Sequence, residues 1–125
     1  MSHPPVLVVG AGPTGLTLAC ALHRFGAGCR VVDRRPGPAT EPKALVLWSG
    51  ALEALRRTGV AESVVAEALA LSGATYWARR RRIGAVRFGR LAGTAFPAPL
   101  CLPQPVTERL LHERLIGRAS CRERV

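Results

Sequence analysis

Six consecutive residues near the N-terminus have the types and spacing of a turn that binds phosphate. They fit the pattern G-x-G-x-x-G, in the order Gly10, Ala11, Gly12, Pro13, Thr14 and Gly15. In this pattern the first glycine permits a tight turn, the second lets the backbone approach a pyrophosphate, and the third lets a helix pack closely on a sheet. The anion lies against backbone N–H groups at the positive end of the helix dipole. The motif therefore predicts a turn that binds the pyrophosphate of a dinucleotide.

The elements that must position this turn are present on both sides of it. Residues Val6–Val9 form a continuous apolar run, which is typical of a strand buried on both faces of a parallel sheet. Apolar residues then recur at helical spacing from Leu16 to Phe25, and Gly26 ends the predicted helix. Arg30–Asp33 predicts a second strand, parallel to the first because the helix carries the chain back. We therefore predict an α/β fold with a Rossmann-like βαβ unit.

An acidic residue ends the second predicted strand, eighteen residues after Gly15. From this position the carboxylate of Asp33 accepts hydrogen bonds from both ribose hydroxyls of a dinucleotide. The same charge repels a 2′-phosphate, which disfavours NADP on this unit. The alternative interpretation is a glycine turn in an α/β core without a ligand. We favour the dinucleotide because the strand, turn, helix, second strand and acid all occur in the expected order.

Further residues carry a resemblance to a known family. The extended dinucleotide-binding fingerprint of FAD enzymes of the glutathione-reductase type is matched by the glycine turn, Ala19, Leu22, Gly26 and Asp33–Arg34. Cys29 replaces the usual valine and keeps an apolar side chain. The match continues in residues 33–38, 43–45, 52–55, 59, 102–104 and 107–111. Over about residues 5–115, the chain resembles the N-terminal part of FAD-dependent aromatic-ring hydroxylases, the para-hydroxybenzoate hydroxylase-like monooxygenases.

The resemblance implies a role for each matched residue at an FAD site. It assigns the pyrophosphate to Gly10–Gly15 and the adenosine ribose to Asp33, with Arg34 on the adenine side. Lys43 stands where the family commonly has an arginine near the cofactor; lysine keeps the charge but lacks the planar fork. Gln104 matches a glutamine that contacts the cofactor on its flavin side. The alternative for Lys43 and Gln104 is that both are solvent-exposed loop residues.

The resemblance also implies the activity of a longer parent protein. Such a parent uses FAD, NADPH or NADH as reductant, and O2 to hydroxylate a small aromatic or polyketide-like substrate. Its further FAD-contact segments, with Asp-Gly and Gly-Asp, and its β-rich substrate domain are absent from these 125 residues. We therefore expect the chain alone to be inactive, and we identify no catalytic side chain. Another FAD oxidoreductase, of the prenyl reductase or halogenase type, is the alternative within this class.

The rest of the chain alternates between short elements and irregular segments. We expect a loop at 36–42, helices at 47–57 and about 61–69, and strands at 75–78 and 83–88. The arginine run at 79–82 would form the turn of a β-hairpin, with a functional anion site as the alternative. Residues 89–105 look irregular, and Thr107 is expected to cap a last helix. The prediction is thus an incomplete parallel sheet plus a short hairpin.

Composition and charge limit the other classes of function. The net charge is +10, from 18 basic residues of which Lys43 alone is a lysine. A basic nucleic-acid-binding module is the alternative from another class, but no aromatic residues are interleaved with the arginine run. We predict no nucleic-acid partner. The cysteines have no metal-ligand spacing, the apolar runs are too short for a membrane span, and the N-terminus lacks signal-peptide features, so we expect no metal, no membrane span and a cytoplasmic location.

The last ten residues, 116–125, break the leucine periodicity of the preceding helix. They match the conceptual translation of a common sequencing-adapter read. We therefore predict that residues 1–115 are the N-terminal part of an FAD-binding domain and that residues 116–125 are a non-native, adapter-derived tail. A parallel sheet without its later strands exposes an edge and an apolar face, so we expect the isolated chain to aggregate.

Overall fold

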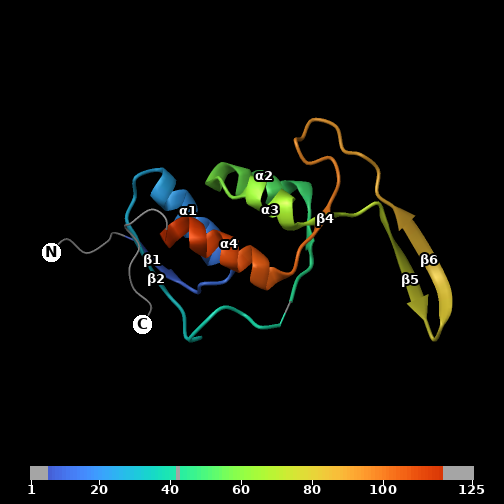
Figure 1. Cartoon of the computed structure of the whole chain (residues 1–125), viewed down its shortest axis with the longest axis horizontal. Helices are drawn as coiled ribbons and strands as arrows, with labels where there is room; N and C mark the ends of the chain where they lie inside the picture. Colours follow the sequence, from blue (N-terminus) through green and yellow to red (C-terminus); the bar gives the residue numbers. More distant parts are fainter. Residues whose placement is uncertain (1–5, 42, 117–125) are drawn as a thin grey trace.

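The computed structural model describes residues 6–41 and 43–116, which form four helices and three small sheets. In chain order the elements are β1 (Val6–Val9), α1 (Pro13–Arg24), β2 (Cys29–Val32), β3 (Val46–Leu47), α2 (Ser49–Thr58), α3 (Ala61–Glu67), β4 (Leu69–Ala70), β5 (Gly73–Ala78), β6 (Arg81–Arg87), β7 (Leu100–Cys101) and α4 (Gln104–Ile116). Figure 1 shows α1 and α4 side by side above β1 and β2, with the β5–β6 hairpin projecting away from the helices.

The predicted βαβ unit is confirmed. β1 and β2 pair in parallel with Val6 opposite Cys29 and Val9 opposite Val32. α1 connects them and ends at Arg24, with Phe25 as its C-cap, and Gly26 follows with a φ of 74°, the left-handed conformation that glycine adopts without strain. The register brings the carboxyl ends of both strands to the same edge, where the glycine turn begins. The chain is therefore α/β with a Rossmann-like start.

A second sheet was not predicted, because its strands are too short to show an alternating pattern. It is antiparallel with β7 in the centre, paired with β3 on one side and β4 on the other, and each strand has two residues. The prediction placed Leu47 and Leu69 in helices, but Leu47 belongs to β3 and Leu69 to β4. This sheet matters for the site because it places Ala44 and Leu45 beside the start of α4.

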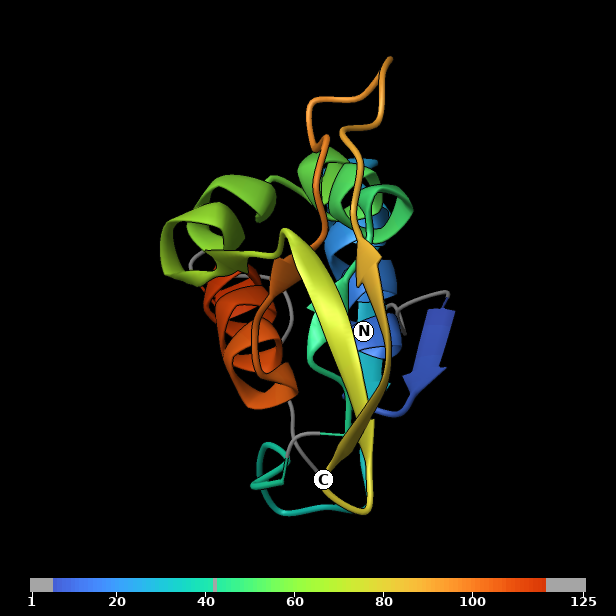
Figure 2. The same ribbon diagram turned by 90° about the vertical axis from the view of Figure 1, so that its right-hand side faces the viewer.

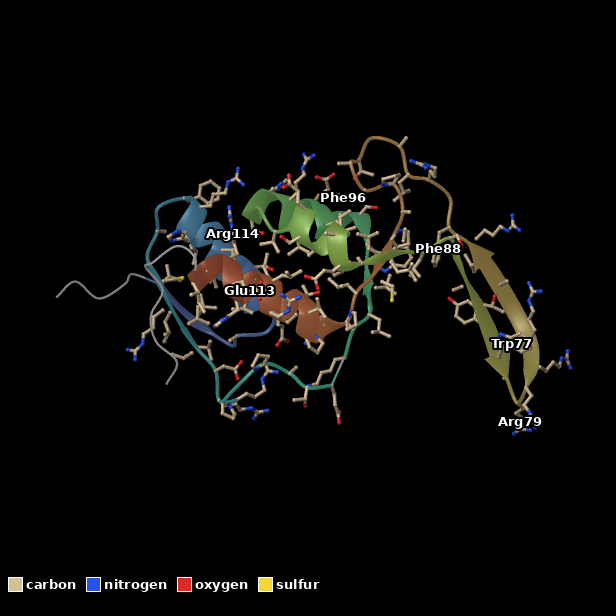
Figure 3. The ribbon with its side chains drawn as sticks, viewed as in Figure 1. Trp77, Arg79, Phe88, Phe96, Glu113 and Arg114 are labelled. Carbon is tan, nitrogen blue, oxygen red and sulfur yellow. The ribbon has the colours of Figure 1, made fainter. Side chains whose placement is uncertain are left out.

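The predicted hairpin is confirmed, but its turn is tighter than expected. Arg81 and Arg82 belong to β6, so only Arg79 and Arg80 form the turn, with φ values of 46° and 66°. Figure 2 shows the two strands from the hairpin side, in front of the helices. At the base of the hairpin, the rings of Trp48 and Phe88 pack edge to face, with their centroids 5.3 Å apart. Figure 3 shows Phe88 at the base of the hairpin and Arg79 at its tip.

The last helix begins earlier than predicted. α4 starts at Gln104, so Thr107 is a buried residue of the helix rather than its cap. Pro105 was assigned to an irregular segment, yet proline is well suited to the first turn of a helix because no intrahelical partner exists there for its missing N–H. The Pro103 carbonyl accepts the N–H groups of Val106 and Thr107, which starts the helix.

The core lies between the helices and one face of the parallel sheet. Its most deeply buried side chains include Ala19, Leu52, Val64 and Leu111, each about 0% exposed. The other face of β1 is open, with Leu7 61% and Val9 79% exposed. The prediction that this strand is buried on both faces is therefore wrong for these residues, because helices cover only one face of the pair.

The predictions about a membrane span and about the C-terminal tail can be compared with the structure only over the described residues. No helix within 6–41 and 43–116 has the length and apolar character that a membrane crossing requires. Of the predicted tail 116–125, only Ile116 is described, as the last residue of α4; the remaining nine positions lie outside the described residues.

Candidate functional site

The glycine turn continues the pairing of the parallel strands. The N–H of Gly10 donates to the Val32 carbonyl at 2.7 Å, one residue beyond the end of β1. Gly10 has a φ of 110°, a conformation that side-chain-bearing residues rarely adopt. The chain can therefore leave the strand sharply at this point, and a glycine is required for it.

The other two glycines of the motif differ in what surrounds them. A Cβ on Gly15 would overlap the Gly10 carbonyl oxygen and lie 3.3 Å from Cγ1 of Val8, so α1 approaches the turn and β1 too closely for any side chain. A Cβ on Gly12 would meet nothing within 4 Å. Packing within the chain therefore explains the glycine at 15 but not the one at 12, and the open space at Gly12 is what a bound pyrophosphate would need.

The N-terminus of α1 faces this space without a side-chain cap. Gly12 is the N-cap residue, and the first intrahelical bond runs from the Leu16 N–H to the Gly12 carbonyl at 2.9 Å. The N–H groups of Thr14 and Gly15 precede that bond, so they have no partner within the helix, and Pro13 has no N–H at all. Two N–H groups and the positive end of the helix dipole are thus available to an anion.

Asp33 follows β2 directly and is held by several donors. Its carboxylate accepts the Ala11 N–H at 2.7 Å and the Arg35 N–H at 2.8 Å. The Arg35 side chain adds longer contacts of 3.3 and 3.4 Å. These bonds, chiefly the Arg35 N–H, then its guanidinium and the Ala11 N–H, hold the pKa of Asp33 well below its usual range. The acid is therefore ionised and fixed beside the glycine turn.

Arg35 is a site residue that the sequence analysis missed. Arg34, which the resemblance places on the adenine side, is exposed, whereas Arg35 is partly buried and pairs with Asp33. The pairing also raises the pKa of Arg35. The two arginines are adjacent and chemically identical, so only the backbone direction after β2 decides which one turns toward the acid.

A cleft of about 490 Å³ opens next to Asp33. The turn after β1, the loop after β2 and one face of α4 form its walls, and its lining includes Ala11, Asp33, Arg35, Pro38, Glu108 and His112. Its lining is mostly apolar and includes the anionic acceptor Asp33, which suits the adenosine half of a dinucleotide. Glu108 and His112, both from α4, are further lining residues that no sequence motif identified.

The structure brings Gln104 and the segment after Lys43 together. Pairing of β3 with β7 continues outward, so that the Leu102 N–H donates to the Leu45 carbonyl at 2.8 Å and the Gln104 N–H to the Ala44 carbonyl at 3.2 Å. Lys43 is exposed, and Gln104 is partly buried in the first turn of α4. The Gln104 side chain donates through Nε2 to Glu108 at 2.8 Å. The segment that follows Lys43 is thus hydrogen-bonded to Gln104, although Lys43 and Gln104 are 61 positions apart in the sequence.

A second, smaller cavity of about 240 Å³ lies at the other end of α1, lined in part by Arg24, Thr58 and Arg114. Its basic side chains already serve the ends of helices. Arg24 donates to the Arg57 carbonyl at the end of α2, and the Arg114 guanidinium, visible in Figure 3, lies against Gly59. Cations at these positions satisfy carbonyls and the negative end of the dipole. This cavity is therefore separate from the glycine turn and is explained by helix capping.

The residues present fit the adenosine and pyrophosphate portion of FAD. The open position at Gly12, the two N–H groups of α1, the ionised Asp33 and the adjoining cleft all lie at the carboxyl edge of the parallel pair. Dinucleotides bind at this edge in open α/β sheets. Nothing within the described residues forms a cluster of His, Cys, Asp or Glu suited to a metal ion.

Known proteins match this chain along most of its length. It is 44% identical over 118 residues to the 6-methylpretetramide 4-monooxygenase of Streptomyces rimosus, and the match covers 91% of this chain and 21% of that relative. The chain therefore spans about a fifth of the length of this relative. It is homologous to FAD-dependent monooxygenases and corresponds to a short portion of them.

Solved structures and a family match agree with the sequence relationship. The p-nitrophenol 4-monooxygenase of Pseudomonas putida DLL-E4 superimposes with a TM-score of 0.82 and 26% identity, covering 93% of this chain and 30% of that protein. The flavin-dependent monooxygenase PieE, solved with FAD and substrate, superimposes with a TM-score of 0.80 and 30% identity. The match covers 94% of this chain and 22% of that protein. Residues 3–123 match the family described as FAD binding domain. The chain therefore belongs to the FAD binding domain family.

Proposed function

We propose that this chain forms the adenosine and pyrophosphate half of the FAD site in a flavin-dependent monooxygenase. The observation that carries the proposal is the open space at Gly12, next to an ionised acid and a cleft. Packing within the chain does not require a glycine at this position. The proposed contacts are the pyrophosphate with residues Gly10, Ala11, Gly12, Pro13, Thr14 and Gly15, the ribose with Asp33, the adenine side with Arg34, and the flavin side with Lys43 and Gln104.

The proposed reaction is hydroxylation of an aromatic or polyketide-like substrate with O2 and NADPH or NADH. FAD supplies the redox chemistry when bound, and this chain's residues orient its adenosine end and exclude water from it. The substrate class is supported by relatives whose names include 6-methylpretetramide, anhydrotetracycline and tetracenomycin A2. The chain spans 21% of the first of these relatives, so the substrate is proposed for the complete protein.

The proposed domain organisation follows the sequence. Residues 1–115 are the N-terminal part of the FAD-binding domain, and 116–125 are a non-native tail. Sequencing the source DNA across the codons for residues 110–125 tests the boundary. An adapter sequence joined to an interrupted gene supports it, whereas genomic codons that continue through residue 125 refute it.

The function is tested by expressing the complete reading frame that contains this chain and recording its visible spectrum. Bound flavin absorbance, together with NADPH or NADH oxidation and incorporation of one oxygen atom into anhydrotetracycline as a probe substrate, supports the proposal. Bound flavin without oxygen transfer to any aromatic probe would restrict the proposal to cofactor binding. A folded, colourless protein that does not bind added FAD would overturn it.

A further inference from the structure

Glu108 is a buried carboxylate in the wall of the cleft, and neither the motif nor the family match assigns it a role. Only 2% of the residue is exposed, and it lies on α4 one helical turn after Gln104. A charged side chain removed from water requires strong hydrogen-bond partners. Each of its two carboxylate oxygens has its own hydrogen-bond partner, one in α4 and one in the loop after β2.

One oxygen faces the helix and the other faces the loop after β2. Oε1 accepts Nε2 of Gln104 at 2.8 Å, and Oε2 accepts the Ala39 N–H at 3.1 Å. Ala39 adjoins Gly37 and Pro38, which line the cleft. Because both oxygens are engaged and buried, the carboxylate cannot rotate without breaking one of these bonds. Glu108 therefore joins the loop wall of the cleft to the first turn of α4.

This arrangement determines which way the Gln104 amide points. A carboxylate only accepts hydrogen bonds, so Gln104 must present its NH2 group to Glu108. Its carbonyl oxygen and its second N–H then remain for another partner. We propose that Glu108 is a positioning residue for FAD binding: it fixes the donor and acceptor sense of the Gln104 amide. The inference rests on the proposed function, in which Gln104 contacts the cofactor.

The substitution Glu108→Gln tests this with little change in volume. An amide accepts through only one of its two ends. If its oxygen keeps the Ala39 N–H, its NH2 group donates toward Gln104, whose amide must invert to present its oxygen. The variant thus keeps the loop contact and reverses the group that Gln104 offers to a ligand. Glu113→Gln is the matched control, since Glu113, labelled in Figure 3, lies on the same helix. Its side chain is 57% exposed and is paired with Arg109.

The experiment is a titration of the complete apo-protein with FAD, followed by flavin fluorescence and visible circular dichroism. We expect Glu108→Gln to weaken FAD binding by roughly tenfold and to change the flavin dichroism, because the reversed Gln104 amide loses one hydrogen bond to the cofactor. Glu113→Gln should match the unaltered protein. Thermal unfolding of each apo-variant is measured alongside, and the FAD affinity is calculated for the folded fraction only.

A double-mutant cycle with Gln104→Ala separates positioning from a general structural role. If Glu108 acts through Gln104, then Glu108→Gln has little further effect on FAD affinity in the Gln104→Ala background. An equal loss in both backgrounds, or unchanged FAD affinity in the single variant, would overturn the inference. Failure of the unaltered protein to bind FAD would instead refute the proposed function, so the two failures are distinguishable.

Discussion

The carboxylate of Asp33 accepts the backbone N–H of Ala11 at 2.7 Å, which ties the end of β2 to the glycine turn after β1. The bond spans 22 positions of sequence and stands beside the last pairing of the strands, from the Gly10 N–H to the Val32 carbonyl. Asp33 therefore stabilises the glycine turn itself as well as offering an acceptor to a ribose. The Arg35 side chain makes longer contacts with the same carboxylate, so a ribose would compete with that guanidinium rather than with the backbone donors.

The second and third glycines of the motif, Gly12 and Gly15, should respond differently to substitution. Gly12→Val in the complete protein is expected to abolish FAD binding while the protein still folds, because the new side chain enters open space that the pyrophosphate needs. Flavin content after purification and the apo-protein melting temperature are measured. Gly50→Val is the control, since a Cβ at Gly50, in α2, also meets open space. Normal flavin content in Gly12→Val would contradict the pyrophosphate assignment.

Gly15→Ala should instead damage the fold. Its Cβ would overlap the Gly10 carbonyl oxygen, so α1 must move away from β1 to accommodate a single methyl group. We expect a loss of about 1–3 kcal/mol in the free energy of unfolding, as for other overpacked positions. Urea unfolding of the apo-protein measures it. A variant as stable as the unaltered protein would show that α1 does not approach the turn this closely.

Removing the acid should weaken cofactor binding. Asp33→Ala deletes the proposed acceptor for the ribose hydroxyls, and we expect FAD affinity to fall by roughly ten- to a hundredfold. Equilibrium titration with FAD gives the affinity, and circular dichroism verifies that the variant is folded. Glu41→Ala removes the same charge from an exposed position and should leave the affinity unchanged. Equal affinities for the two variants would exclude the ribose role.

The depressed pKa of Asp33 predicts how stability depends on pH. The folded state binds the proton of this carboxyl less readily than the unfolded chain does, chiefly because of the Arg35 N–H, then the Arg35 guanidinium and the Ala11 N–H. Its contribution to stability is therefore complete above the unfolded pKa, about 4, and is lost as the pH falls toward the folded value. The stability difference between the unaltered protein and Asp33→Asn should shrink below about pH 4. Urea unfolding at pH 7, 5 and 3 measures it, and a constant difference would contradict the assignment.

The sequence by itself determined the parts of this protein that depend on local order. The strand, glycine turn, helix, second strand and Asp33 follow one another within 28 residues, from Val6 to Asp33, and each depends on the residues next to it. The apolar periodicity predicts the helix. The glycine at position 10 allows the positive φ with which the chain leaves the strand sharply. The hairpin is equally local, although its turn, predicted over residues 79–82, contains only Arg79 and Arg80.

The tertiary structure decided the contacts between distant residues. Ala39 and Glu108 are 69 positions apart, and their hydrogen bond exists only because α4 packs beside the loop after β2. No spacing rule identifies such a pair. The two-residue strands β3, β4 and β7 pair with one another across the chain, and the β3–β7 pairing continues into the hydrogen bond from the Gln104 N–H to the Ala44 carbonyl, next to Lys43. Burial, which made Glu108 a fixed partner instead of a solvated acid, is likewise a property of the packed molecule.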